Sequence, residues 1–381
     1  MALKGVRVVE LAGLAPAPFC GMVLSDFGAN VVRVDRARAG NALDRLARGK
    51  QSIAVDLKQK EGINVVRKLC CSADVLIEPF RKGVMERLGL GPDQLMSENP
   101  RLIYARMTGY GQKGDLSNRA GHDINYLAIS GMLSRLGRQG EKPYAPINLL
   151  ADFAGGGLMC AMGILMALME RHQSGKGQIV DASMVEGAAY VSSFVWQSVD
   201  LPMWGAGRGE GWLDGAAPWY DTYETSDGKF MAVGAIEPQF YTQLIKGLGL
   251  EPHEAWQFNN DWPQLREKFA KKFASKTQAE WCAIFDEVDA CVTPVLSMEE
   301  AASYPHNKQL GTFRKKAQTG LTVPRPAPAL SRTPGATQEL NNPEAGQHTY
   351  EILSALGYKS DEMKRLVEAG AVEQAETASK L

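Results

Sequence analysis

The stretch "GVRVVELAGLAPAPFCGMVLSDFGANVVRVD", residues 5–35, contains two valine-rich runs with a helical segment between them. The runs "GVRVVEL" and "ANVVRVD" have the β-branched composition of strands. The segment "APAPFCGMVLSDFG" is typical of a turn followed by a helix that stops at its last glycine. A strand, a helix and a strand in this order predict a βαβ unit.

The same alternation continues toward the middle of the chain. Short apolar runs predict strands at 51–58, 73–79, 101–109 and 177–183. Helices are predicted at 61–70, 83–89 and 153–171, and a further one begins near Met184. Apolar strands that alternate with helices favour a parallel, doubly wound sheet with both faces covered. The predicted fold class is therefore α/β, with a Rossmann-like large domain.

The second half of the chain has a different composition. Glycine, tryptophan and proline replace the periodic pattern at 201–220, as in a long ordered connection. Beyond it, a hairpin about a Ser-Asp-Gly turn and three helices are predicted, the helices at 238–247, 262–274 and 276–287. The predicted parts are a large domain, a linker, a small α+β domain, a proline-rich linker and C-terminal helices that return to the large domain, at 1–187, 188–220, 221–310, 311–335 and 336–381.

Charge and composition argue against several classes of function. Lys plus Arg number 42 and Asp plus Glu 43, so no global field attracts nucleic acid or an anionic membrane. The six cysteines form no CxxC pair and no secretory leader precedes them, which predicts reduced thiols in an intracellular compartment. The five histidines have no metal-site spacing, so we expect no metal. The longest apolar run, 154–169, is shorter than the roughly 20 residues of a membrane span and predicts a buried helix instead.

The segment "GYGQKG", residues 109–114, matches the G-x-G-x-x-G pattern of dinucleotide sites and follows a predicted strand. A dinucleotide site requires the motif to open a helix whose amides face the pyrophosphate. The sequence that follows, "DLSNRAGHD", has no apolar periodicity. We therefore expect no nicotinamide cofactor.

Basic residues follow three predicted strands, as Arg36, Lys58 and Arg81, with Arg87 one helix further on. The carboxyl ends of the strands line the ligand crevice of an open parallel sheet. Taken singly, each residue is a solvated loop charge. Taken as a set, the four predict a site for a polyphosphate, which arginine binds with two parallel hydrogen bonds.

Long motifs spread along the chain resemble those of one family. They include "RVVELAGLAPAPF", "NPRLIYARMTGYGQKG", "AGHDINYLAISG", "NLLADFAGGG", "SGKGQIVDASMVEG" and "DACVTPVL". The sequence resembles the α-methylacyl-CoA racemases of the class III CoA-transferase superfamily. The resemblance implies interconversion of (2R)- and (2S)-2-methylacyl-CoA thioesters, among them branched-chain fatty acyl-CoA and bile-acid intermediates. It also implies an interlocked homodimer, and no cofactor, because acyl-CoA is the substrate.

Racemisation at C2 needs a base on one face, an acid on the other, and stabilisation of the enolate oxygen. His122 suits the base because the ordinary pKa of histidine lies near neutrality. Asp152 precedes "FAGGG", and a helix N-cap is its plain interpretation, but the resemblance implies that it is the second acid/base. The three glycines would let substrate approach the helix N-terminus, whose amides, or that of Asp123, would hold the enolate oxygen.

The resemblance further implies an orienting residue and a binding set. Glu237, alternatively a helix cap, corresponds to a glutamate that the partner's small domain supplies to the catalytic imidazole. A turn role for Asp123 is weighed equally with a chemical one, and core packing is the default for Tyr126. The predicted catalytic residues are His122, Asp152 and Glu237. The predicted contacts to substrate and CoA are Arg36, Val55, Asp56, Leu57, Lys58, Arg81, Arg87, Gly121, Asp123, Ile124, Asn125 and Tyr126.

Two other functions are weighed against racemisation. A CoA-transferase of the same superfamily would use Asp152 as a nucleophile that carries acyl groups. Such transferases resemble one another in a glycine-rich loop where this chain has "VGAIEPQF", and they need no histidine like His122. An acyl-CoA carrier without catalysis would leave the histidine and both carboxylates unexplained.

The chain ends in Ser379, Lys380 and Leu381, a tripeptide that the peroxisomal import receptor reads. The alternative is a chance tripeptide on a frayed tail. We expect a peroxisomal protein, with the mitochondrion as an additional location.

Overall fold

The computed structural model describes residues 1–38, 44–205, 207–258, 261–316, 319–336 and 341–375. The chain forms two compact units. The large unit comprises Met1–Ser130, Pro146–Ser192 and Arg314–Leu381, and the small unit comprises Gly131–Ala145 and Ser193–Phe313. Residues 131–145 therefore pack in the small unit, although the sequence analysis assigns them to the large domain. Ser379, Lys380 and Leu381 lie outside the described residues.

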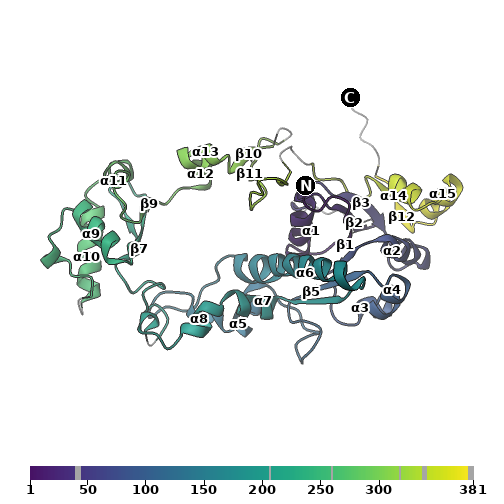
Figure 1. Cartoon of the computed structure of the whole chain (residues 1–381), viewed down its shortest axis with the longest axis horizontal. Helices are drawn as coiled ribbons and strands as arrows, with labels where there is room; N and C mark the ends of the chain where they lie inside the picture. The colour runs from purple at the N-terminus through teal and green to yellow at the C-terminus, as the bar shows by residue number, and fades with distance from the viewer. Residues whose placement is uncertain (39–43, 206, 259–260, 317–318, 337–340, 376–381) are drawn as a thin grey trace. The chain divides into compact units, whose positions relative to one another are not determined.

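A seven-stranded sheet forms the centre of the large unit (Figure 1). Its order is β12-β3-β2-β1-β4-β5-β6, in which β1 to β6 are parallel and β12 is antiparallel to β3. The strands are β1 Arg7–Leu11, β2 Asn30–Arg36, β3 Gln51–Val55, β4 Val75–Glu78, β5 Ile103–Thr108, β6 Ile179–Ser183 and β12 Val372–Glu373. The strand order reverses between β1 and β4. The predicted Rossmann-like α/β fold is confirmed, with β12 as a strand that the sequence analysis missed.

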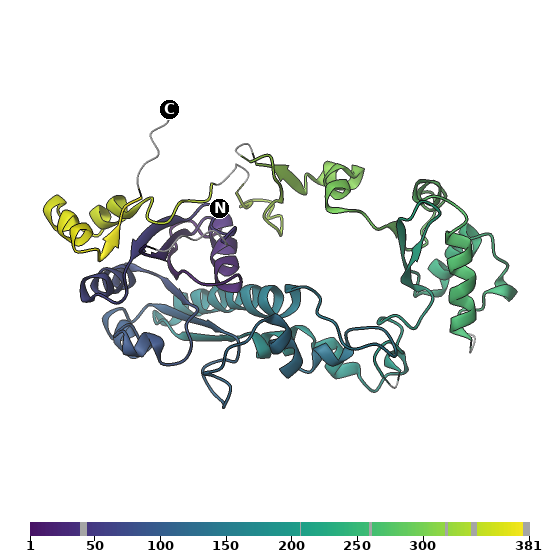
Figure 2. The same ribbon diagram turned by 180° about the vertical axis from the view of Figure 1, so that it is seen from behind.

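Helices cover this sheet. On one face, Val65, Val66 and Leu69 of α2 pack in a core with strand residues such as Ile53 and Leu76. Helices α1 and α6 contact each other, and each also contacts strands of the sheet. Figure 2 shows α14 and α15, in yellow, beside the sheet edge that β12 forms. The helices of the large unit are α1 Pro16–Asp26, α2 Lys60–Ser72, α3 Val84–Arg87, α4 Pro92–Glu98, α5 Asp123–Ile129, the π-helix η2 Leu149–Leu158, α6 Met159–Ser174, α7 Met184–Val191, α14 Thr349–Ala355 and α15 Ser360–Glu368.

The η2 and α6 segments form one continuous helix, Leu149–Ser174, which is longer than the apolar run in the sequence. Among the described residues it alone is long and apolar enough to cross a membrane, by length and composition that the core helix of a soluble protein can also have. Only 39% of its most apolar window is buried, so the prediction of a buried helix is wrong for one face. That face carries Leu158, Met162, Leu165, Met166 and Met169, which are exposed and spaced along one side of a helix.

The small unit has a three-stranded antiparallel sheet, of which the sequence predicts the first hairpin. Its strands are β7 Tyr220–Glu224, β8 Phe230–Gly234 and β9 Val292–Pro294. Trp219, Tyr241, Phe269 and Trp281 are the centre of its core. Its helices are η1 Met132–Arg135, α8 Ser193–Ser198, η3 Pro202–Trp204, α9 Pro238–Gly247, η4 Pro252–Glu254, α10 Trp262–Phe273, α11 Gln278–Phe285, α12 Met298–Ser303 and α13 Pro305–Leu310. A two-stranded ribbon follows, formed by β10 Phe313–Lys315 and β11 Thr322–Pro324.

A fully buried ion pair lies beneath α1 in the large unit. Lys50 Nζ donates to both carboxylate oxygens of Glu10, at 2.8 and 2.7 Å, and to the Pro18 carbonyl at 2.9 Å. Neither side chain has any exposed surface. Gly21 makes room for the pair, because a Cβ at that position would lie 1.6 Å from Glu10 Oε2. Burial raises the pKa of Glu10 to about 7, against the opposing effect of Lys50.

Candidate active site

A cavity of about 370 Å³ opens in the large unit where the strand order reverses. Residues 12–14, 79–81 and 107–110, which end or follow β1, β4 and β5, form one wall of it. His122 and Asp152 also line the cavity. The crevice at the carboxyl ends of the strands, at the switch in strand order, is the usual ligand site of this architecture.

His122 is the residue before α5, in an extended conformation with φ −133°. Its backbone N–H donates to Asn125 Oδ1 at 3.0 Å, which fixes the start of the helix. The side chain is exposed and lines the cavity, so the imidazole is accessible to a ligand. The motif "AGHDINYLAISG" therefore combines the start of a helix with a histidine that lines the cavity.

Tyr126 supports the segment that carries His122. Its hydroxyl donates to the Gly121 carbonyl at 2.5 Å, and its ring packs edge-on against Tyr110 with centroids 5.1 Å apart. A Cβ on Gly109 would lie 2.1 Å from this ring, so the first glycine of "GYGQKG" serves packing. Burial, and secondarily Asp152, raises the pKa of Tyr126 to about 12. The hydroxyl therefore stays protonated near neutral pH.

Asp152 lies inside the first turn of η2 and not at its N-cap, which is Asn148. Within the described part of the chain, its carboxylate accepts one side-chain hydrogen bond, from Asn148 Nδ2 at 3.2 Å. Burial raises the pKa of Asp152, and the negative charge of Asp123 raises it further, while Asn148 and His122 act in the opposite direction. A half-buried carboxyl with a raised pKa, in a cavity with an imidazole, is suited to proton transfer. The N-cap interpretation of Asp152 is thus wrong.

Asp123 is the residue that caps η2. Its Oδ1 accepts hydrogen bonds from the amides of Ala151 and Asp152, both at 2.8 Å. Those two amides are therefore not free to hold an enolate oxygen, contrary to one of the sequence-based expectations. The amide of Asp123 itself has no acceptor among the described residues and remains a candidate donor. The two hydrogen bonds that the Asp123 carboxylate accepts join the segment of His122 to the helix of Asp152.

The glycines of "FAGGG" serve helix packing. A Cβ on Gly155 would lie 2.5 Å from the Ala188 amide, and one on Gly157 would lie 2.7 Å from the Phe19 ring. The expectation that these glycines admit substrate is therefore wrong, because α7 and α1 already occupy the space. The close approach brings α1, η2 and α7 together behind the cavity.

A family model described as CoA-transferase family III matches residues 3–349. The chain belongs to CoA-transferase family III. Alpha-methylacyl-CoA racemase of Homo sapiens is 58% identical over 368 residues, which cover 96% of each chain. The beta subunit of a succinyl-CoA–L-malate CoA-transferase from Chloroflexus aurantiacus is 30% identical, over 94% of this chain and 95% of that subunit. The crystal structure of a CAIB/BAIF family protein from Brucella suis has a TM-score of 0.81 at 24% identity and covers 93% of this chain and 99% of that one, which shows the shared fold.

The predicted CoA-contacting residues of this family III chain fall into two groups. Arg81, Gly121 and Tyr126 line the cavity with His122 and Asp152. The other predicted contacts do not line it: Arg36, Val55, Asp56, Leu57, Lys58, Arg87, Asp123, Ile124 and Asn125. Of these, Val55 is buried in β3, Leu57 packs on the core, and Ile124 is exposed.

Three of the basic residues lie at the carboxyl ends of strands of the large sheet. Arg36 ends β2, Lys58 follows β3 and Arg81 follows β4, and these strands are parallel. All three are exposed, and no ion pair involves them within the described residues. Asp56 accepts the Lys58 amide at 2.9 Å, and this hydrogen bond is the main cause of its lowered pKa. The Asp56 carboxylate therefore shapes the loop, while the cations remain free for an anion.

Glu237 lies in the small unit, as the residue before α9, and is not among the residues that form this cavity. Most of the residues that line the cavity are absent from the predicted set, among them Thr108 and Arg119. Thr108 ends β5 with a buried hydroxyl that has no partner among the described residues, and Arg119 precedes the His122 segment. A polar residue at the end of a predicted strand was the available signal for Thr108. Within the described residues, no group of three or more His, Cys, Asp or Glu side chains is placed to hold a metal ion.

Proposed function

We propose that this chain is a racemase that interconverts (2R)- and (2S)-2-methylacyl-CoA thioesters. The observation that carries this proposal is the pairing of His122 and Asp152 in one cavity, in a family III chain 58% identical to a named racemase over 96% of its length. An acyl-CoA carrier without catalysis would not need an imidazole and a carboxyl in the same cavity. The enzyme class is isomerase.

In the proposed reaction, one proton leaves C2 and one proton is delivered to the opposite face of C2. One of the two groups, His122 or Asp152, takes the C2 proton, and the electron pair moves into the thioester carbonyl to form an enolate. The other group delivers a proton to the opposite face of C2, and the carbonyl re-forms with inverted configuration. The raised pKa of Asp152 supports its protonated form as the acid. The Asp123 amide supplies a donor for the enolate oxygen. Charge balances without an electron acceptor, so the proposed reaction uses no cofactor.

The exposed cations at the strand ends are proposed to bind the phosphates of CoA. Arg36 ends β2, Lys58 follows β3 and Arg81 follows β4, which are parallel strands of one sheet, and Arg87 ends the short helix after β4. Because these cations are distributed along the carboxyl ends of several strands, they suit an extended polyphosphate better than a single small anion.

The alternative function is CoA transfer, in which Asp152 would attack the thioester and carry the acyl group. Wild-type protein incubated with 2-methylacyl-CoA in deuterated water distinguishes the two. A racemase incorporates deuterium at C2 and loses optical activity without a second substrate. A transferase leaves C2 unlabelled and requires a carboxylate acceptor, and that result would overturn the proposal.

We propose that a second copy of the chain covers the exposed apolar face of the continuous helix that η2 and α6 form. Leu158, Met166 and Met169 are between 49% and 71% exposed, a large apolar strip for a helix in water. A homodimer buries such a face, and it allows one subunit to supply Glu237 to the His122 imidazole of the other.

Mixed dimers test this arrangement. His122→Ala and Glu237→Ala chains, each weak alone, are expected to regain activity when unfolded and reassembled together, because one of the two sites then receives both native residues. Size-exclusion chromatography and differently tagged chains establish that mixed dimers have formed. Verified mixed dimers without recovery would show that both residues act within one subunit or that Glu237 has no role at the site.

We also propose peroxisomal import through Ser379, Lys380 and Leu381, which the import receptor would read. A fluorescent protein fused to the N-terminus of the full chain is expected to be punctate with peroxisomal markers. Removal of the last three residues is expected to make the signal diffuse. The same distribution with and without the tripeptide would contradict the proposal, and a mitochondrial signal would report the additional location.

A further inference from the structure

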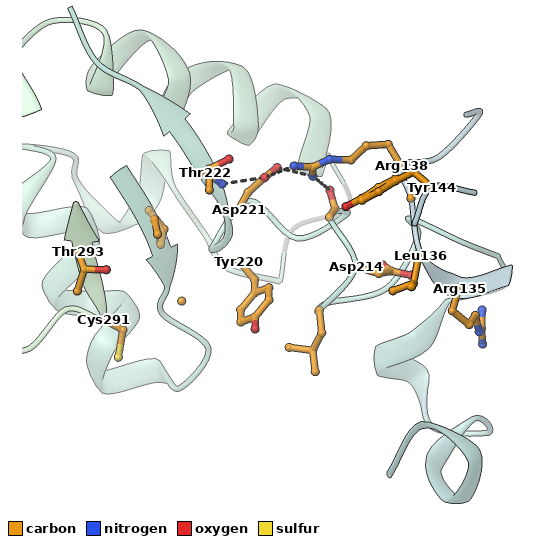
Figure 3. Close-up of a pocket in the computed structure, with 16 residues that line it drawn as sticks. Arg135, Leu136, Arg138, Tyr144, Asp214, Tyr220, Asp221, Thr222, Cys291 and Thr293 are labelled. Atoms are coloured by element: carbon orange, nitrogen blue, oxygen red, sulfur yellow. Dashed lines mark hydrogen bonds and ion pairs between the residues drawn. The ribbon is translucent and has the colours of Figure 1, made fainter. Parts of the chain in front are cut away.

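The small unit contains a cavity of about 640 Å³, and Tyr220, Asp221 and Cys291 are among the residues that line it (Figure 3). The Asp221 carboxylate is 8% exposed and accepts two hydrogen bonds from the Arg138 guanidinium, at 2.7 and 3.1 Å. In the described ranges of the chain, no residue that lines this cavity has a buried polar side-chain atom without a partner. The buried polar groups of this cavity are therefore satisfied within the protein.

The cavity of His122 and Asp152 differs from it in this respect. Thr108 lines this cavity, ends β5 and is 7% exposed, and its Oγ1 has no hydrogen-bond partner among the described residues. None of the other described residues that line the cavity has such an atom. A hydroxyl that is removed from water without a new hydrogen bond is unfavourable. A ligand that hydrogen-bonds to Thr108 would remove this unfavourable contribution.

The backbone of Thr108 is fixed beside the segment that carries His122. The pairing of β5 with β6 holds Thr108 itself. A Cβ on Gly109, the next residue, would lie 2.1 Å from the Tyr126 ring, and the Tyr126 hydroxyl donates to the Gly121 carbonyl. Thr108 Oγ1 is shielded from water, but rotation about the Cα–Cβ bond exchanges it with the methyl group, which is of similar size. The hydroxyl can therefore turn toward the cavity while the backbone stays in place.

The order of the strands places Thr108 between the exposed cations and the two proton-transfer residues. The cations lie at the carboxyl ends of β2, β3 and β4. The helices that begin beside His122 and Asp152, α5 and η2, both contact α7, which follows β6. In the sheet, β5 lies between β4 and β6. A molecule that reaches from the cations to the two proton-transfer residues therefore passes the end of β5, where Thr108 lies.

We infer that the Thr108 hydroxyl binds an amide of the pantetheine arm of CoA. This inference rests on the proposed function, in which the substrate is an acyl-CoA. The pantetheine arm joins the diphosphate of CoA to its sulfur and contains two amides. An amide offers an N–H donor and a carbonyl acceptor, and a threonine hydroxyl can pair with either of them. With its phosphates at the cations and its thioester at His122 and Asp152, an acyl-CoA would place this arm across the end of β5.

The test measures the binding of two ligands to Thr108→Val by isothermal titration calorimetry. One ligand is CoA, and the other is 3′-phospho-ADP, the nucleotide part of CoA without pantetheine. Thr108→Val keeps the shape of the side chain and is expected to weaken CoA binding about 5- to 50-fold, because a pantetheine amide then lacks a partner. The affinity for 3′-phospho-ADP should stay within about twofold of wild type, since that ligand does not reach Thr108. Thr108→Ser retains a hydroxyl and should bind CoA almost as wild type does.

Two further measurements separate binding from stability and catalysis. Thr108→Val is expected to leave the melting temperature unchanged or raise it, because a methyl group replaces a buried hydroxyl without a partner. For 2-methylacyl-CoA, KM should rise while kcat stays within about twofold, as for an interaction made equally in ground state and transition state. Thr322→Val is a matched control, since Thr322 is exposed in β11 and does not line the cavity. It should bind both ligands as wild type does.

Three results would overturn the inference and leave the proposed function standing. Unchanged CoA binding in Thr108→Val with a lower kcat would place the hydroxyl at the thioester or the enolate. Equal weakening of both ligands, with a lower melting temperature, would make Thr108 structural. No change in any measurement would leave the hydroxyl without a role. Wild type that binds no CoA would overturn both proposals, and wild type that binds CoA but exchanges no C2 proton would overturn the proposed reaction alone.

Discussion

In deuterated water, His122→Ala and Asp152→Asn are each expected to lose racemisation by about 10²- to 10⁴-fold, the usual effect of removing a positioned acid or base. Each variant keeps one functional group, which can take a proton from its own face of C2 and return a deuteron to it. The two variants are therefore expected to label opposite epimers with retention of configuration. Chiral analysis of the products measures racemisation, and mass spectrometry measures the deuterium incorporated into each epimer.

His253→Ala and Asp93→Asn are matched controls, because both residues are exposed and neither lines the cavity. Both control variants should racemise at the wild-type rate. If either site variant labelled both epimers equally, a single group would have to reach both faces of C2, and the two-base assignment would be abandoned.

Lys50→Met is expected to lower the free energy of unfolding by about 3–5 kcal/mol, because it leaves the Glu10 carboxyl buried without its partner. The loss should be larger at pH 8 than at pH 5. Without Lys50, the pKa of folded Glu10 rises above its already raised value, while the unfolded carboxyl keeps its ordinary pKa. The folded state then retains a proton that the unfolded state releases, so stability falls as pH rises above the unfolded pKa. Urea unfolding at the two pH values measures the difference.

The double variant Glu10→Met with Lys50→Met is expected to recover most of this loss, since apolar side chains of similar size can replace a buried pair. Lys229→Met removes an exposed partner of Glu300 and should change stability little. If Lys50→Met were as stable as Lys229→Met, water would have to reach Glu10 in the folded protein.

The strands and helices that have a regular apolar pattern could be predicted from sequence, because that pattern depends only on residues close together in the chain. The strands at 51–58 and 101–109 and the helix at 238–247 appear as β3, β5 and α9 with small differences at their ends. The family motifs likewise led to His122 and Asp152. What could not be predicted depends on contacts between distant segments.

Asp123 illustrates the difference. Nothing near it in the sequence indicates that its carboxylate caps a helix that starts at Leu149, because the two segments meet only in the folded chain. The same reason explains why residues 131–145 pack in the small unit. Residues 131–145 have no composition of their own that separates them from the large domain, and Arg138 finds Asp221 far along the chain. The glycines of "FAGGG" were predicted to let substrate approach the helix, because only the folded structure shows that α1 and α7 pack against them.

The pairing of β12 with β3 has a consequence for the order of synthesis. Val372 pairs with Val55, so the edge of the large sheet needs residues that are translated after the small unit. The whole hairpin and helices of the small unit emerge before that strand exists. A domain whose sheet is completed by such a distant segment has to close long loops and so folds late. During translation, the exposed edge of β3 therefore stays open while the small unit is already able to fold, and this interval is when the nascent chain most needs protection from aggregation.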